Sequence, residues 1–466
     1  MAAENGKLHL AMFPWLAFGH MLPFLEFSKL VAEKGHKVSF ISTPRNIDRL
    51  PKLPPHLSPL IDFVALPLPH LKNLPETAEA TVDLPPDGVG YLKNAYDLLQ
   101  KPLTDFLITH KPDWIIYDYV PYWLPAIAKK VDIPTVYFSP FLAATICCVC
   151  PALGDDDYRK TPEDYTVLPK WVPFPSTAAS PRFMAIKLTD AIVGDESRSR
   201  LSEYYRFRGS IRGADIISIR THIEFEPEWL KLAEDLHKKP VIPVGFIAPL
   251  DDDSVDETET WGWIKEWLDK QERGSIVYVA FGTEAKLSQD ELTEIALGLE
   301  LSGLPFFWVL RTHRGSFDPD PLHLPDGFLE RTKAQGVVCT SWVPQLKILG
   351  HDSIGGYLTH SGWSSVIEAL KFGKALVLLS FFADQGRNAK VLEEKKIGYP
   401  IPRNNDDGSF TRNSVAESLS LVMLEEEGKV YKEKAKEMSN LFGDKEKQSL
   451  CMDNFLDHLK ANKRHH

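Results

Sequence analysis

The most informative part of the sequence is residues 342–385, which read WVPQLKILGHDSIGGYLTHSGWSSVIEALKFGKALVLLSFFADQ. The apolar run 356–359 predicts a strand, residues 360–362 predict a tight turn, and the residues through Glu368 predict a helix. A strand that leads through a tight turn into a helix is the basic unit of an α/β fold with a parallel sheet. We therefore expect this segment to run from a sheet into a helix that covers it.

The start of this helix has the features of a phosphate-binding site. The first N–H groups of a helix lack partners within the helix and lie at the positive end of its dipole. Gly362 lets a ligand approach the backbone, and His360, Ser364 and Ser365 add side-chain donors. Glu368 shares a helix face with both serines, where a carboxylate can accept hydrogen bonds from a ribose diol. Taken singly, these residues are also explained as a turn histidine, a capping serine and a solvated glutamate.

Both ends of the segment carry side chains that suit the rest of a nucleotide sugar. Trp342 offers a flat surface for stacking on a base, although a tryptophan in the core would explain it equally well. Asp384 and Gln385 offer acceptors and an amide for a sugar. The combination of a stacking surface, an anion site and a sugar-binding pair predicts a nucleotide-sugar site.

Strand-like runs alternate with helical patterns over the rest of the chain. A first series predicts a parallel sheet covered by helices, and a second series after an acidic stretch repeats the same architecture. Ligands of such doubly wound sheets bind beyond the carboxyl ends of the strands. The first series comprises residues 8–13, 37–42, 61–66, 114–117, 135–139, 216–220 and 241–244, and the second comprises 275–281, 306–310, 336–339, 356–359 and 375–379.

Two residues of the first series are candidates for a catalytic pair. His20 follows the first strand and the predicted turn 15–19, and Asp118 directly follows the strand 114–117. Two strands of one parallel sheet bring their carboxyl-end loops together, and a carboxylate fixes the tautomer of an imidazole and stabilises its protonated form. Spacing alone leaves open that His20 caps a helix and that Asp118 is an ordinary loop residue.

Residues 342–385 resemble the donor-binding signature of the plant family 1 UDP-glycosyltransferases, which invert the configuration of the transferred sugar. The resemblance extends to residues 13–50, 276–288 and 244–250, so it covers essentially the whole chain. Within the family, WLAFGH, STPRNIDRLP and HSGWSS are similar to the group that adds a second sugar to an existing glycoside, which includes glucosyl- and rhamnosyltransferases. The resemblance implies a GT-B fold, in which two doubly wound Rossmann-like domains face each other across a cleft.

The resemblance also implies a role for each candidate residue. His20 and Asp118 would form the catalytic dyad, with His20 taking the proton of the acceptor hydroxyl. The residues that would bind the UDP-sugar are Trp342 on uracil, Val343 and Gln345 on the uridine, Glu368 on the ribose, His360, Gly362, Ser364, Ser365 and the region of Thr283 on the diphosphate, and Trp363, Asp384 and Gln385 on the sugar.

The sequence departs from the family pattern in the phosphate-binding turn. The usual HCGWNS reads HSGWSS here, so that Ser364 replaces an asparagine and Ser361 a cysteine, and the usual Gly-Val-Pro reads Gly-Lys-Ala at 373–375. Serine is shorter than asparagine and has no amide. A phosphate contact is thus lost, passed to water or made by the backbone. Gln385 favours glucose over galactose within the family, but it does not exclude rhamnose.

The resemblance divides the chain into four parts. Residues 1–245 would form an acceptor-binding domain, 246–262 an acidic interdomain linker, 263–440 the UDP-sugar-binding domain, and 441–466 a final helix that packs back on the first domain. Aromatic side chains of the first domain suit aglycones and sugar faces. Candidate acceptor residues are Phe18, Tyr122, Trp123, Phe141 and the region 182–202, although core packing explains many of them equally well.

Composition excludes several other classes of protein. The 466 residues are 44% hydrophobic and 25% charged, and no apolar run is long enough to span a bilayer. A net charge of −11 argues against a nucleic-acid surface. Five cysteines, three of them bunched at Cys147, Cys148 and Cys150, fit reduced core thiols. We expect a cytoplasmic monomer that needs no cofactor beyond its UDP-sugar co-substrate and no metal, with Asp251–Asp253 belonging to the solvated linker.

Three other functions remain open from the sequence. A nucleotide-dependent oxidoreductase would need Gly-x-Gly-x-x-Gly after the first strand, where GHMLPF stands instead. A non-catalytic relative would keep the nucleotide-sugar site without the chemistry, against which the presence of both His20 and Asp118 argues. A transferase acting directly on an aglycone hydroxyl differs from the expected glycoside-specific hexosyltransferase only in its acceptor. The expected acceptor is a sugar hydroxyl of a flavonoid, terpenoid or steroid glycoside.

Overall fold

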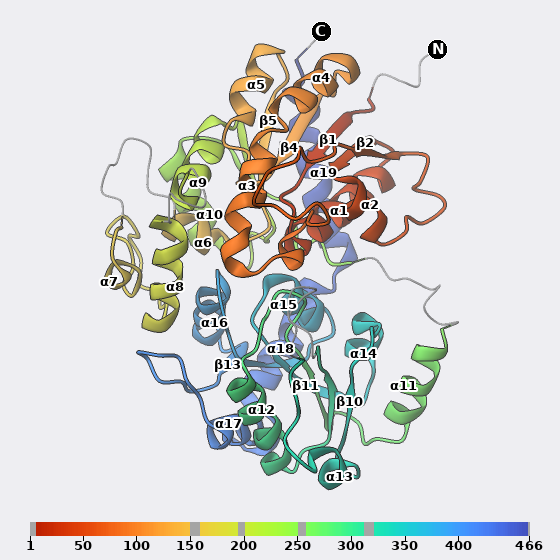
Figure 1. Ribbon diagram of the computed structural model, residues 1–466, viewed down its shortest axis with the longest axis vertical. Coiled ribbons are helices and arrows are strands. Elements are labelled where there is room, and N and C mark those ends of the chain that lie inside the picture. The colour runs from red at the N-terminus through yellow and green to blue at the C-terminus, as the bar shows by residue number, and fades with distance from the viewer. Residues whose placement is uncertain (1–5, 150–158, 194–200, 250–257, 312–320, 465–466) are drawn as a thin grey trace.

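The computed structural model describes residues 6–149, 159–193, 201–249, 258–311 and 321–464. These residues form two parallel sheets, each covered by helices, which lie one above the other in Figure 1. The two-domain α/β architecture expected from the sequence is confirmed. Outside the described residues lie Cys150, Asp251–Asp253 and most of the acidic run of the expected linker.

The first sheet has seven strands in the order β3-β2-β1-β4-β5-β6-β7. Every neighbouring pair is parallel, and the central strands are buried, as their apolar sequences require. The strands are β1 (His9–Phe13), β2 (Lys37–Ser42), β3 (Ile61–Ala65), β4 (Trp114–Tyr117), β5 (Thr135–Ser139), β6 (Ile216–Ile219) and β7 (Val241–Pro243).

The second sheet repeats the same winding with six strands in the order β10-β9-β8-β11-β12-β13. Its last strand, β13, was not predicted, because three residues that include a glycine and a proline carry no strand pattern. The strands are β8 (Ile276–Ala280), β9 (Phe306–Val309), β10 (Gly336–Cys339), β11 (Ile354–Thr359), β12 (Ala375–Leu378) and β13 (Gly398–Pro400).

The strand order reverses between β1 and β4 in the first sheet and between β8 and β11 in the second. The loops that leave two such strands run in opposite directions and open a crevice at the carboxyl edge of the sheet. His20 and Asp118 follow β1 and β4, and Thr283 and His360 follow β8 and β11. All four residues therefore lie at the reversal points of the two sheets.

Helices of the first domain cover both faces of its sheet. Helix α1 begins at Phe18, so His20 lies in the first turn of the helix rather than after the predicted turn. It ends before Gly35, whose φ of 82° is a left-handed conformation that glycine adopts without strain. The helices are α1 (Phe18–Glu33), α2 (Pro44–Arg49), α3 (Val89–Asp97), α4 (Gln100–His110), α5 (Leu124–Lys130), α6 (Ala143–Val149), α7 (Pro162–Tyr165), α8 (Arg182–Val193), α9 (Glu203–Gly213) and α10 (Pro227–His237).

The remaining helices follow the first domain in the sequence. Most of them pack on the second sheet, and α15 and α16 lie at its edge nearest the first domain (Figure 1). They are α11 (Glu259–Asp269), α12 (Gln289–Ser302), α13 (Phe328–Thr332), α14 (Gln345–Gly350), α15 (Trp363–Lys371), α16 (Gln385–Glu394), α17 (Arg412–Leu424), α18 (Lys429–Phe442) and α19 (Lys445–Ala461).

The final helix, α19, packs against the first domain although it follows the second in sequence (Figure 1). The ring centroids of Phe455 and Phe27 are 5.4 Å apart, and the indole N–H of Trp114 donates to the carbonyl of Leu459 at 3.2 Å. Burial of these apolar side chains ties the two ends of the chain into one hydrophobic core.

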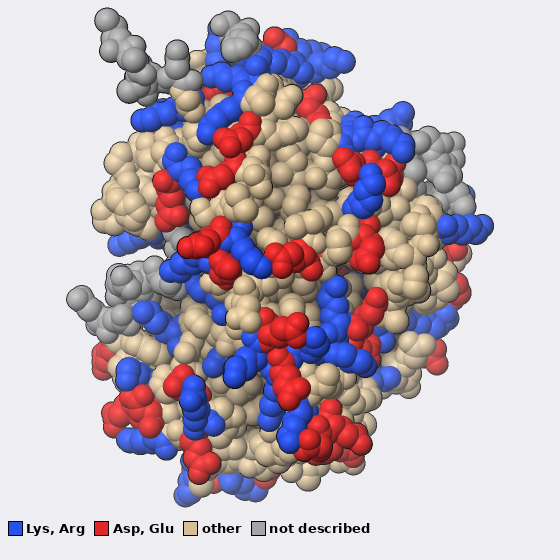
Figure 2. Space-filling model, turned by 180° about the vertical axis from the view of Figure 1, so that it is seen from behind, with Lys and Arg blue, Asp and Glu red and all other residues tan. Residues whose placement is uncertain are grey.

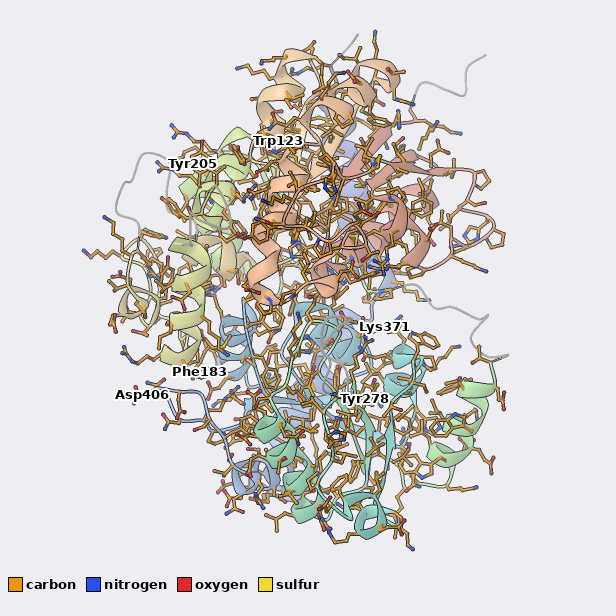
Figure 3. The ribbon with its side chains drawn as sticks, in the orientation of Figure 1. Trp123, Phe183, Tyr205, Tyr278, Lys371 and Asp406 are labelled. Carbon is orange, nitrogen blue, oxygen red and sulfur yellow. The ribbon has the colours of Figure 1, made fainter. Side chains whose placement is uncertain are left out.

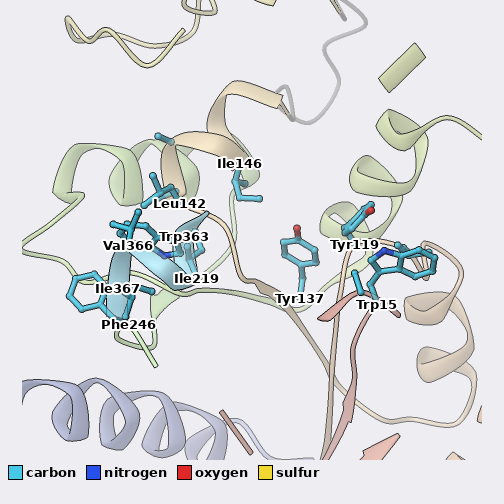
Figure 4. Close-up of a cluster of buried hydrophobic side chains, with 14 of the residues drawn as sticks. Trp15, Tyr119, Tyr137, Leu142, Ile146, Ile219, Phe246, Trp363, Val366 and Ile367 are labelled. Carbon is cyan, nitrogen blue, oxygen red and sulfur yellow. The ribbon is translucent and has the colours of Figure 1, made fainter. Parts of the chain in front are cut away.

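A cluster of aromatic residues fills the junction between the domains. The indole of Trp363 in α15 lies near Phe246, which follows β7 (Figure 4). Phe246 stacks on Phe442 with ring centroids 3.7 Å apart, and Phe225 stacks on Trp363 at 5.5 Å. Because these residues come from both domains and from the end of α18, the cluster holds the start of α15 against the first domain.

The surface carries charges of both signs, which alternate over most of the face in Figure 2. Many of them pair along one helix, as Lys265 and Asp269 do in α11. No helix within the described part of the chain combines the length and apolar character that a membrane crossing needs. The described residues also hold no cluster of three or more His, Cys, Asp or Glu side chains arranged for a metal ion.

Candidate active site between the two sheets

The structure brings His20 and Asp118 into contact at the reversal point of the first sheet. Nδ1 of His20 lies 2.7 Å from Oδ2 of Asp118. The carboxylate is fully buried and also accepts backbone N–H groups from Trp15, at 3.1 Å, and Tyr119, at 2.7 Å. Three donors thus fix its position, and its contact with Nδ1 leaves Nε2 of His20 free to take a proton.

Two opposing effects set the pKa of His20. Burial lowers the pKa, whereas the charge and hydrogen bond of Asp118 raise it, and the net shift is upward. Asp384 and Glu284, both from the second domain, raise the pKa further through their charges. A histidine beside a buried carboxylate is therefore a stronger base than a free imidazole. The contribution of Asp384 and Glu284 also means that loops of the second domain face His20.

Aromatic rings surround the imidazole of His20. The Phe141 ring meets it edge-on with centroids 5.2 Å apart, and Tyr119 lies at 5.7 Å. Phe207 of α9 stacks on Tyr119 at 4.2 Å. Such rings exclude water from the base and offer flat apolar surfaces to a substrate.

Among the described candidate acceptor residues, Phe141 is the one whose ring packs on His20. Phe18 donates its backbone N–H to Glu284 of the second domain. Tyr122 packs on Tyr205 instead, and Trp123 is buried, with its indole N–H donating to Asp97 at 3.0 Å. Figure 3 shows Trp123 and Tyr205 in the upper domain, away from the junction. The region 182–202 forms α8 as far as Val193, and residues 194–200 lie outside the described part of the chain.

Two glycines flank His360 in the second domain. A Cβ atom at Gly282 would lie 2.8 Å from the His360 ring, and one at Gly362 would lie 2.3 Å from its Nε2. Both distances are shorter than real side-chain contacts, so the imidazole fits only because residues 282 and 362 have no side chain. Burial lowers the pKa of His360 to about 4, which keeps the ring neutral at physiological pH. The exposed Thr283 follows Gly282 in the same turn.

Helix α15 starts beside His360, with Gly362 at its N-cap. The hydroxyl of Ser364 accepts a hydrogen bond of 2.6 Å from Nη1 of Arg220, and Ser365 is buried. The indole of Trp363 points into the aromatic cluster and donates to the carbonyl of Arg220 at 2.8 Å. This placement differs from the expectation that Trp363 meets the sugar, because its side chain is buried and hydrogen-bonded at the domain junction.

Glu368 lies further along α15 and joins a network of polar groups. Its Oε2 accepts from the amide of Gln345 at 2.6 Å, and the Gln345 carbonyl accepts from the hydroxyl of Tyr278, a residue of β8, at 3.0 Å. Burial raises the pKa of Glu368, whereas Gln345 and the charge of Arg220 lower it. Trp342 is 64% exposed, which is unusual for a tryptophan and leaves its ring available for stacking. Val343 beside it is buried.

The loop before α16 carries the expected sugar-binding pair. Ala383 has a φ of 55°, a strained conformation for a residue with a Cβ atom. Asp384 accepts from Asn388 at 2.7 Å, and burial raises the pKa of Asp384. The side-chain carbonyl of Gln385 accepts hydrogen bonds from the backbone N–H groups of Phe381 and Phe382, at 2.8 and 3.2 Å. Two backbone donors thus fix the side-chain oxygen of Gln385, whose side chain is buried.

Four residues at this junction were not identified from the sequence. Tyr119 directly follows Asp118, and Glu284 directly follows Thr283. Their positions just after β4 and β8 could have identified both residues from the sequence. Arg220 directly follows β6, a third strand end. Phe207 lies in α9, where no signal in the sequence separates it from core residues.

Comparisons with known proteins agree with this geometry. A family model described as "UDP-glucoronosyl and UDP-glucosyl transferase" matches residues 214–456. UDP-glycosyltransferase 91A1 of Arabidopsis thaliana is 53% identical over 99% of this chain and 98% of its own. Soyasaponin III rhamnosyltransferase of Glycine max is 41% identical over 98% of each chain.

Solved structures match the fold. The crystal structure of Glycyrrhiza uralensis UGT73P12, complexed with glycyrrhetinic acid 3-O-monoglucuronide, superimposes with a TM-score of 0.77 at 22% identity and covers 98% of this chain and 96% of its own. This similarity supports the GT-B architecture. The family model and the relatives that match over nearly their whole length show that the chain belongs to the plant family 1 UDP-glycosyltransferases and is a UDP-dependent hexosyltransferase of the group numbered 91.

Proposed function

We propose that this enzyme transfers a hexose, glucose or rhamnose, from a UDP-sugar to a sugar hydroxyl of a flavonoid, terpenoid or steroid glycoside. The observation that carries the proposal is the placement of the His20–Asp118 pair opposite the charges of Asp384 and Glu284. A base from one domain faces a candidate sugar-binding loop from the other. The name of the Glycine max relative, a rhamnosyltransferase acting on soyasaponin III, supports a glycoside acceptor.

In the proposed complex, different groups of the second domain bind different parts of the UDP-sugar. The exposed ring of Trp342 stacks on uracil, the Val343 backbone and Gln345 contact the uridine, and Glu368 binds the ribose diol. His360, the N-terminus of α15 and the Thr283 turn bind the diphosphate. Asp384 and the Gln385 amide bind the hexose.

The proposed reaction is a single displacement. Nε2 of His20 takes the proton from the acceptor hydroxyl while its oxygen forms a bond to the anomeric carbon. The bond from that carbon to the β-phosphate oxygen breaks on the opposite face, so the configuration inverts. UDP leaves with the electron pair. Asp118 stabilises the imidazolium, and the neutral His360 and the helix N-terminus stabilise the charge that develops on the phosphate.

Each part of the chain has its own role in the proposed reaction. Residues 1–245 bind the acceptor through the aromatic rings around His20, residues 263–440 bind the donor, and the connection lies within 246–262. The last helix of 441–466 closes the first domain. The described cysteines are buried and form no disulfide bond with one another, which fits a reducing compartment such as the cytoplasm.

Product mass tests the proposal directly. The purified enzyme receives UDP-glucose and UDP-rhamnose together, with paired acceptors: flavonoid and triterpenoid aglycones and their monoglucosides. We expect a hexose or deoxyhexose increment on the monoglucosides and none on the aglycones. Transfer to the aglycones alone would contradict the sugar-on-sugar assignment. UDP binding without any product would favour a non-catalytic relative.

A further inference from the structure

A buried arginine of the first domain, Arg220, reaches the candidate diphosphate site of the second. Its side chain is 2% exposed, and its backbone N–H donates to the carbonyl of Ser139 at 3.0 Å. It directly follows β6, at the carboxyl edge of the first sheet. The backbone of Arg220 is thus fixed at the ends of β5 and β6, and its guanidinium is buried.

The hydrogen bonds of this guanidinium go to uncharged groups. Nε donates to the carbonyl of Phe246 at 2.7 Å, Nη2 to that of Ile247 at 2.9 Å, and Nη1 to the hydroxyl of Ser364 at 2.6 Å. Among the described residues, no carboxylate lies within ion-pair distance of Arg220. The charges of Glu368 and Glu26 favour the charged guanidinium from beyond that distance, but burial outweighs them, because a buried charge without a counter-ion in contact is costly. The site gains from an anion beside it, and burial lowers the pKa of Arg220 only to about 10, so the side chain remains charged at neutral pH.

Arg220 holds the first turn of α15 from two sides. Its guanidinium donates to Ser364, and its backbone carbonyl accepts from the indole of Trp363, the preceding residue. A hydroxyl that accepts from a cation becomes a stronger donor for its own hydrogen. That hydrogen belongs to a side chain beside the unpaired N–H groups of the helix N-terminus, where an anion binds.

We propose that Arg220 is a positioning residue for the donor diphosphate, acting through Ser364, so that the first domain supplies the positive charge of a site built otherwise by the second. The inference rests on the proposed donor site. It also gives Ser364 a role: the arginine and the short hydroxyl together supply a phosphate donor without an amide. The charge of Arg220 also opposes the rise that burial causes in the pKa of Glu368, at the ribose end of the site.

A purely structural role for Arg220 is the competing explanation, because the carbonyl groups of Phe246 and Ile247 belong to the segment that leaves the first domain. The affinities of the enzyme for UDP and for uridine distinguish the positioning role from the purely structural role. Both ligands share the base and the ribose, and only UDP carries the diphosphate. Calorimetry on Arg220→Met should show UDP binding weakened about tenfold or more, with uridine binding within about twofold of wild type.

Three further variants complete the test. Ser364→Ala should lower UDP affinity selectively, and the double variant Arg220→Met/Ser364→Ala should lose little more than either single variant, because the two side chains act as one unit. Arg220→Lys keeps the charge and should retain part of the preference for UDP. If Arg220→Met does not fold, Ser364→Ala and Arg220→Lys decide the question by the same ratio.

Arg206 provides the matched control, since it is equally buried but pairs with Asp97 in the first domain. Arg206→Met should lower the melting temperature without changing the ratio of UDP to uridine affinity. If Arg220→Met left the ratio of UDP to uridine affinity unchanged, whether by weakening the binding of both ligands equally or by weakening neither, the inference would be overturned. A wild-type protein that binds UDP no more tightly than uridine would instead contradict the donor site itself.

Discussion

Nδ1 of His20 lies 2.7 Å from Oδ2 of Asp118, although 98 residues separate them in the chain. The reversal of strand order between β1 and β4 explains this contact, because it places the ends of two distant strands side by side. The carboxylate is fully buried and accepts from two backbone N–H groups besides the imidazole. The pair is therefore preorganised before any substrate binds.

Replacement of the base tests its role in catalysis. His20→Ala should lower kcat by about 100- to 10,000-fold, because the acceptor hydroxyl then loses its proton to water alone. UDP binding, measured by calorimetry, should stay close to wild type because His20 is not among the residues proposed to contact UDP. His110→Ala, an exposed histidine of α4, serves as the control and should leave both quantities unchanged. Turnover by His20→Ala within a few-fold of wild type would rule out the base.

The pH dependence of kcat/KM reports the pairing with Asp118. His20 must be neutral to accept a proton, and its net pKa lies above the usual 6.5, so activity should fall on the acid side with a midpoint above 6.5. Asp118→Asn removes the charge that raises the pKa, while burial continues to lower it. The midpoint should then move to lower pH as the maximum rate falls, although the charges of Asp384 and Glu284 remain. A midpoint that stayed in place would contradict the electrostatic role of Asp118.

The fit of His360 between two glycines predicts a steric effect. Gly362→Ala places a Cβ atom 2.3 Å from Nε2 of His360, so the ring has to move. Overpacking costs about 1–3 kcal/mol, and the donor KM should rise by about five- to a hundredfold. Gly262→Ala in α11 is the matched control, because nothing lies within 4 Å of the added atom. Equal donor KM values for the two variants would show that the position of His360 does not matter.

Discrimination between ribose and deoxyribose tests Glu368. If the carboxylate binds the ribose diol, the wild type should prefer UDP over 2′-deoxy-UDP, and Glu368→Ala should lose most of that preference. A hydrogen bond to a charged group contributes about 1.5–3 kcal/mol, so the preference should fall by about tenfold or more. The ratio controls for folding because both ligands share base and diphosphate. An unchanged ratio would remove Glu368 from the ribose site.

Regular packing made most of the fold predictable. Buried parallel strands appear in the sequence as short apolar runs, so twelve of the strands were anticipated, whereas β13 was missed for lack of such a run. The start of α1 was also misplaced. Its N-cap is Ala17, which makes no side-chain capping bond, and Phe18-Gly19 reads as a continuation of the turn.

Tertiary contacts decided what the sequence could not reveal about the site. The sequence motifs predicted which residues gather at the strand ends. The side chain of Trp363, however, packs in a cluster with Phe225, Phe246 and Phe442, and no local sequence pattern predicts this orientation. Arg220 reaches Ser364 across 144 residues, so its role depends on how the two domains meet. Long-range polar contacts of this kind have no periodicity to read.

The anomeric configuration of the new glycosidic bond tests the central claim most directly, because the claim is a single displacement with His20 as base. NMR of the product formed from UDP-glucose, whose glucose is α-linked, gives the configuration. The account predicts a β-linked product from the wild type. An α-linked product would require two displacements or a front-side attack, and would contradict the mechanism assigned to the His20–Asp118 pair.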